Sequence, residues 1–95
     1  MAQQIYGIVT ADGKKNSGSG FSVSRDEEGK YSITWDNQFA QTPGVAATIV
    51  RLSDQWYPTD GVDVGNVTNA GCMVFTMKSN SYSEDRDFSI IAIGD

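Results

Sequence analysis

The chain has 95 residues, of which 39% are hydrophobic and 20% are charged, and its formal net charge is −5. Its seven Lys and Arg residues are too few to build the clustered basic surface that binds nucleic acid or an anionic membrane, so neither is expected as a partner. This length suits a single domain, residues 1–95, with one apolar core.

The first predicted strand lies in "QQIYGIVT". The polar stretch "KKNSGSG" that follows, from Lys14 to Gly20, is interpreted as an exposed loop. The next segment, Gly18 to Phe39, alternates apolar and polar residues on either side of "RDEEG". This period of two, interrupted by acids and a glycine, predicts an antiparallel hairpin whose turn needs a positive φ at Gly29.

Four further segments continue the pattern: "GVAATIVRLS", "GVDVGNVT", "GCMVFTMKS" and "DFSIIAIG". Each is bounded by clusters of Gly, Pro, Asn, Asp or Ser, and no segment favours a helix. The stretch "KSNSYSEDRD", from Lys78 to Asp87, is too polar to pack and is expected to be an exposed loop with a charged tip. About seven short strands at this spacing predict an all-β fold, a small antiparallel β-sandwich.

Three of the predicted strands, in "VAATIVRL", "CMVFTM" and "FSIIAI", are apolar on both faces. Their second faces centre on Val50, Phe75 and Ile91. Because a sheet in a small monomer usually leaves one face to water, these second faces need a cover. We expect the cover to be a further copy of the chain. The alternative is that these are central strands of a strongly coiled sandwich, wrapped by the chain's own loops.

The residues that catalysis or metal binding would need are scarce. The chain has no histidine to act as the base of a Ser-His-Asp or Cys-His arrangement, and its one cysteine, Cys72, lies in an apolar strand where an inert, buried thiol is expected. A zinc site needs several Cys or His ligands, and the chain has one such residue altogether, so zinc is effectively excluded. Asp60, Asp63 and Asn66 could bind calcium, but their spacing does not match an EF-hand, and solvated turn acids are the better interpretation. We expect no cofactor and no enzymatic activity; a glycosidase-like pair of acids is a distant third hypothesis.

The stretch "RLSDQWYPTDG", Arg51 to Gly61, is the most suggestive of binding. Trp56 and Tyr57 are adjacent, so they point to opposite sides of an extended chain, and Pro58 ends the strand behind them. An exposed ring beside charged groups is typical of a sugar site, but one ring can equally close the open end of the sandwich. The candidate ligand-binding residues of this stretch are Arg51, Asp54, Trp56, Tyr57 and Asp60.

The order of "SGSGFSVSRDEEGKYSITWDNQF", "PGVAATIV", "VTNAGCMVFT" and "DRDFSIIAIGD" resembles a β-sandwich module at the C-terminal ends of bacterial and phage tail fibres. The architecture is similar to that of H-type lectins. This resemblance implies binding rather than catalysis, a homotrimer, and a sugar site near the subunit junction. A ring of identical subunits would bring "SDQWYPTD" near "SNSYSEDRD" of a neighbour, which adds Tyr82 and Arg86 to the candidate ligand-binding residues.

Two hypotheses for the function follow. The leading one is a non-enzymatic module for multivalent carbohydrate binding, with a cell-surface glycan as its partner. The alternative is a structural, trimerising or protein-interaction module without a sugar site. No run of 18 apolar residues predicts membrane insertion, and "MAQQIYGIVT" lacks the features of a signal peptide, which leaves the localisation open between synthesis in the cytoplasm with release and association with a tail-like particle.

Overall fold

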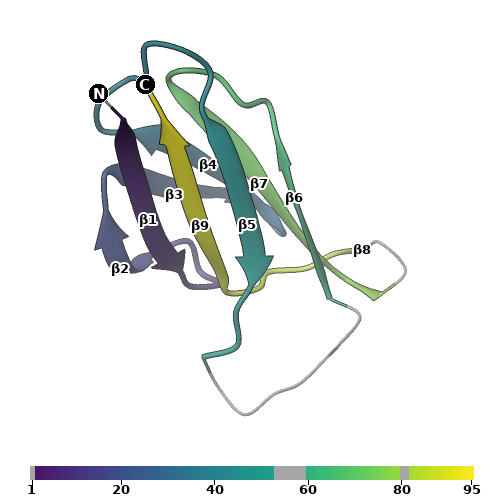
Figure 1. Ribbon diagram of the computed structural model, residues 1–95. Helices are drawn as coiled ribbons and strands as arrows, with labels where there is room; N and C mark the ends of the chain where they lie inside the picture. Colours follow the sequence, from purple (N-terminus) through teal and green to yellow (C-terminus); the bar gives the residue numbers. More distant parts are fainter. Residues whose placement is uncertain (1, 53–59, 80–81) are drawn as a thin grey trace.

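The computed structural model describes residues 2–52, 60–79 and 82–95, and these residues form a β-sandwich of two antiparallel sheets (Figure 1). The first sheet has the strand order β2-β1-β9-β5, and the second has the order β3-β4-β7-β6, with β8 paired to the end of β7. The strands are β1 (Gln3–Val9), β2 (Lys15–Ser19), β3 (Phe21–Glu27), β4 (Lys30–Trp35), β5 (Gly44–Ile49), β6 (Gly61–Gly65), β7 (Gly71–Lys78), β8 (Tyr82–Ser83) and β9 (Phe88–Gly94). The predicted all-β sandwich is confirmed. Within the described ranges no helix is long and apolar enough to cross a membrane.

The predicted hairpin is formed by β3 and β4, with Phe21 opposite Trp35. Gly29 has a φ of 72° in its turn, as the sequence predicts. The turn is not a free tip, because the N–H of Gly29 donates to a carboxylate oxygen of Asp85 (2.7 Å) and its carbonyl accepts the N–H of Thr76 (2.9 Å). The hairpin is therefore tied to the strand β7 beside it and to the segment that precedes β9.

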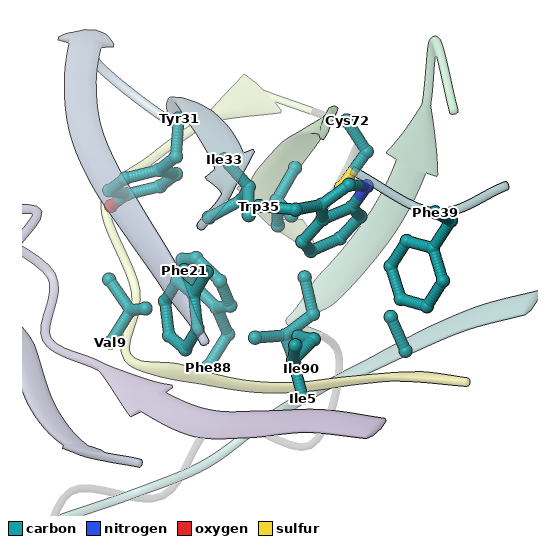
Figure 2. Close-up of a cluster of buried hydrophobic side chains, with 12 residues drawn as sticks. Ile5, Val9, Phe21, Tyr31, Ile33, Trp35, Phe39, Cys72, Phe88 and Ile90 are labelled. Carbon is teal, nitrogen blue, oxygen red and sulfur yellow. The ribbon is translucent and has the colours of Figure 1, made fainter. Parts of the chain in front are cut away.

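The core lies between the two sheets, where alternate residues of each strand point inward (Figure 2). Two aromatic pairs pack edge to face in it, Tyr31 with Phe88 at a centroid distance of 5.0 Å and Trp35 with Phe39 at 5.7 Å. The buried apolar residues are Ile5, Val9, Phe21, Tyr31, Ile33, Trp35, Phe39, Cys72, Val74, Phe88, Ile90 and Ala92. Cys72 is thus buried, as expected.

The polar stretch Lys14 to Gly20 is a strand rather than the predicted loop. Its residues form β2, which pairs with β1 at the edge of the first sheet. The backbones approach closely at Gly18, whose φ is 101° and where an added Cβ would lie 2.0 Å from the carbonyl oxygen of Tyr6. Polar side chains suit a strand at the edge of a sheet, and only glycine fits this contact, so the composition resembles that of a loop.

The described part of the stretch Lys78 to Asp87, residues 78–79 and 82–87, is also not a free loop. After the short strand β8, the hydroxyl of Thr76 donates to the carbonyl of Glu84 (2.6 Å), and the carboxylate of Asp87 accepts the N–H of Ala11 (2.7 Å). Residues 84–87 are half-buried. The acids that the sequence marks as a charged tip therefore fasten one end of the sandwich.

The strands with two apolar faces differ in how their outward side chains are covered. In β7 the outward residues Met73, Phe75 and Met77 are half-buried. In β9 the outward residues Ile91 and Ile93 are 43% and 46% exposed. The chain's own neighbours thus give partial cover in the second sheet, while the outward isoleucines of the first sheet face solvent.

Candidate functional site

A charged cluster lies where β5 ends, β6 begins and the segment before β9 passes, at the lower end of the sandwich in Figure 1. The carboxylate of Asp60 lies at its centre, with a side chain only 2% exposed. One of its oxygens, Oδ2, lies 2.7 Å from Nε of Arg86 and 3.6 Å from Nη2 of Arg51. Three segments of the chain thus meet at one carboxylate.

The pairing explains why an acid can be buried at this position. A carboxylate taken out of water is strongly unfavourable unless charge and hydrogen bonds compensate it, and two guanidinium groups supply both to Asp60. The side chains of Arg51 and Arg86 are 28% and 24% exposed, so each extends from the buried acid to the surface. The Nε of Arg86 donates to Asp60 and its Nη1 to the carbonyl of Asp85. Guanidinium groups carry several N–H donors in a planar fork, a chemistry that suits hydroxyl or carboxylate oxygens.

Tyr82 lies at the same end of the molecule. It belongs to β8, is 63% exposed, and pairs with Lys78 at the end of β7. Gly61, the first residue of β6 and the neighbour of Asp60, pairs with Met77 of the same strand. Because Met77 and Lys78 are consecutive, Tyr82 and Asp60 flank the same end of β7 from its two sides.

A second polar network, centred on Asp85, is structural. Its carboxylate accepts hydrogen bonds from Nε of Arg25 (2.9 Å), the N–H of Gly29 (2.7 Å) and the hydroxyl of Tyr31 (3.3 Å). Burial acts to raise the pKa of Asp85, but the bonds from Arg25 and Gly29 outweigh it, so the pKa lies below its ordinary value. Burial raises the pKa of Tyr31 to about 12. These groups hold the β3–β4 turn against the end of the sandwich.

The structure brings together part of the predicted site. Arg51, Asp60 and Arg86 are in contact within one chain, and Tyr82 lies at the same end. The other predicted residues, Asp54, Trp56 and Tyr57, lie outside the described residues. Arg86, which the resemblance places near a neighbouring subunit's site, is engaged by Asp60 of its own chain.

The sequence did not indicate a polar hollow of about 380 Å³ on the outer face of the second sheet. Ser32 and Thr34 of β4 line it on one side, and Asn66 and Thr68 of the β6–β7 turn line it on the other, beside the thioether of Met73. Hydroxyl and amide groups next to an apolar surface can also bind a sugar. The only sequence signal is the alternation of polar residues in β4, which is equally typical of any solvated face.

The chemistry of catalysis and metal binding finds little support in the described residues. Burial raises the pKa of the Cys72 thiol to about 11, so the reactive thiolate is scarce near neutral pH. No three His, Cys, Asp or Glu side chains gather into a possible metal site in residues 2–52, 60–79 and 82–95. Of the three oxygen ligands considered for calcium, Asp60 is taken by the two arginines.

Comparison of the chain with protein-family models, with curated proteins and with solved structures finds no match in any of the three.

Proposed function

We propose that the protein is a non-enzymatic carbohydrate-binding module that acts as an assembly of identical copies, with its sugar site at the end of the sandwich formed by Arg51, Asp60, Arg86 and Tyr82. The observation that carries the proposal is the nearly buried Asp60 carboxylate, which fixes two partly exposed guanidinium groups at the end of the sheet that also bears an exposed tyrosine ring. Such a site needs no catalytic base.

Each component has a role in binding a sugar. The guanidinium groups donate hydrogen bonds to hydroxyl oxygens, and the ring of Tyr82 offers an apolar face to the C–H groups of a pyranose. A small, open site of this kind binds weakly, so several copies on one assembly would be needed for avidity on a surface rich in glycans. The resemblance to trimeric lectins makes three copies the expected number.

A glycan array with the purified protein, followed by calorimetry on the best ligand, tests the proposal. Tyr82→Ser should weaken binding of the single sugar about 5-fold, since loss of a stacked ring removes on the order of 1 kcal/mol. Tyr82→Phe is the matched control and should retain most of the affinity, because it keeps the ring. Equal affinities of both variants and the wild type would contradict the proposed site.

Two further results have distinct meanings. Thr34→Arg fills the polar hollow on the second sheet, and Ser24→Arg adds the same charge at another exposed position of that sheet as a control. If Thr34→Arg alone abolishes binding, the sugar site lies in the hollow. If the wild type binds no glycan at all, the structural or protein-interaction module becomes the better hypothesis.

A further inference from the structure

Among the described residues, the outer face of the first sheet carries no charged side chain. This face, which we call the apolar face, consists of the outward residues Gln4, Tyr6, Ile8, Ser17, Ser19, Gly44, Ala46, Thr48, Ser89, Ile91 and Ile93. A chain with 20% charged residues would be expected to place several charges over a face of this size. Their absence from all eleven positions is typical of a surface that is covered in the native protein.

The exposed apolar side chains of this face are contiguous. The strand register places Tyr6 of β1 opposite Ile91 of β9, and Ile91 opposite Ala46 of β5. Tyr6 is 60% exposed and Ile91 43%, and Ile93, at 46%, lies one step along the same face. Single exposed hydrophobic residues are ordinary, but a patch across three adjacent strands indicates an interaction surface.

The apolar face carries a projecting side chain next to a hollow. Tyr6 projects from β1, and beside it lies a hollow of about 390 Å³ lined by the small residues Ser17 and Ser89 together with Ile8 and Ile91. A surface with a projection and a hollow side by side can bind a further copy of itself, with the projection of one copy entering the hollow of the next, and such a head-to-tail contact can close into a ring of three. This geometry favours a further copy of the chain over an unrelated partner.

Charge gives the second reason for a copy of the same chain. Two molecules that each carry a net charge of −5 repel one another, so they meet most favourably on faces without charge. A basic partner would instead be attracted to acidic surfaces elsewhere on the chain. The apolar face therefore discriminates in favour of self-association.

The size of the face is sufficient for a weak, specific contact. Four strands about 4.8 Å apart and about six residues long cover roughly 400 Å² in projection. Projecting side chains raise the accessible area that two such faces bury together to about 1,000 Å², near the lower limit for a specific interface. We expect an association that depends on protein concentration in the micromolar range.

We propose that the apolar face is the contact between copies of this chain, which pack sheet against sheet with Tyr6 of each copy in a neighbour's hollow. The inference deepens the proposed function, since it names the surface that makes the module multivalent, and it rests on the assembly postulated there. Its observations are separate from those of the sugar site.

Light scattering coupled to size exclusion, at about 100 µM protein, tests the inference. The wild type should have the mass of at least two copies, and Ile91→Lys should reduce it to the 10.3 kDa of one chain. Leu52→Lys is the matched control, because Leu52 is also exposed, at 47%, but lies beyond the end of β5 and outside the strands that form the apolar face. Ile93→Lys serves as a second test if Ile91→Lys fails to fold.

A monomeric wild type would overturn the inference, as would an assembly that survives both Ile91→Lys and Ile93→Lys. The fate of the sugar site is read separately. A monomeric Ile91→Lys protein should bind a single soluble sugar as tightly as the wild type and lose only its avidity for a dense glycan surface. Dissociation by Ile91→Lys in a protein that binds no sugar would support the interface and reject the sugar site.

Discussion

The two outer faces of the sandwich carry similar apolar stripes, but only one of them is covered by its own chain. On the second sheet the stripe of Met73, Phe75 and Met77 is half-buried. On the first sheet Ile91 and Ile93 are almost half exposed. The strands β7 and β9 share the same alternation and both lie inside their sheets, so the pattern along each strand does not explain the difference.

The residues on neighbouring strands explain it. Phe75 lies over Gly65 of β6, where an added Cβ would be 3.2 Å from its ring, and Met77 lies over Gly61 in the same way, at 3.3 Å. Gly44, next to Ile93 in the first sheet, has no side chain packed over it among the described residues, since an added Cβ would make only an ordinary van der Waals contact with the backbone oxygen of Ile93, at 3.8 Å. Glycines in β6 thus let the second sheet bury its own stripe, while the apolar face of the first sheet remains available to a partner.

The largest expected effect on stability comes from truncating one outward side chain in each apolar stripe, Phe75 of β7 and Ile91 of β9. Phe75→Ala should lower the free energy of unfolding of the monomer by about 3 kcal/mol, because its ring packs within the chain. Ile91→Ala should cost less than about 1 kcal/mol at protein concentrations low enough to keep the chain monomeric. Urea unfolding at 1 µM and at 100 µM measures both, and only Ile91→Ala should change the dependence on concentration. Equal costs at 1 µM would erase the distinction between the faces.

Raising the pH should lower the stability of the fold through groups of the second sheet, and it should leave the contact through the apolar face unchanged. The pKa values of Cys72 and Tyr31, both in the second sheet, are raised to about 11 and about 12, so the unfolded chain loses these protons first and stability falls as pH rises. We expect a loss of about 2 kcal/mol between pH 8 and pH 10, most of it from Cys72.

Cys72→Ala is the control for this experiment, and it should reduce the loss over that interval to less than about 0.5 kcal/mol. The self-association constant, which depends on uncharged residues at the contact, should not fall between 50 mM and 500 mM salt, because salt screens only the repulsion between the two net charges of −5. A steep fall with salt would mean that attraction between charged groups, and therefore another surface, makes the contact.

The smallest expected effect on stability comes from replacing each of two glycines, Gly44 and Gly65, by alanine. Gly44→Ala should stabilise the monomer by about 0.5 kcal/mol, because the new methyl group makes only an ordinary contact, at 3.8 Å, and the unfolded chain becomes less flexible. Gly65→Ala should destabilise it by about 0.5–1 kcal/mol, because the methyl group displaces the ring of Phe75. Thermal melts of dilute protein give both values. A change in stability of the same sign for the two variants would show that Gly65 is not needed to accommodate the ring of Phe75.

The sequence predicted the features that depend on one strand and its turn. The alternation in β3 and β4, the positive φ of Gly29 and the burial of Cys72 all follow from local pattern. β2 was missed because a polar, glycine-containing edge strand has the composition of a loop.

Features that depend on register could not be predicted. Asp60 and Arg86 were both candidate residues, but their contact joins positions 26 residues apart and appears only once β6 and β9 are placed. In the same way, the cover of Phe75 depends on which glycine of β6 lies opposite its ring, and no pattern within β7 contains that information. The contacts of Asp85 with Gly29 and of Asp87 with Ala11 could not be predicted for the same reason, because each joins residues that are distant in the sequence.

The central claim, that the apolar face joins copies of the chain, is tested most directly by isotope-filtered nuclear Overhauser spectroscopy on a mixture of methyl-labelled and unlabelled protein. The spectrum reports only contacts between different chains. We predict contacts from the methyl groups of Ile91 and Ile93 to a neighbour's protons, including the ring of Tyr6. Intermolecular contacts confined to Met73 and Met77 of the second sheet, or none at a concentration where the wild type is assembled, would contradict the account.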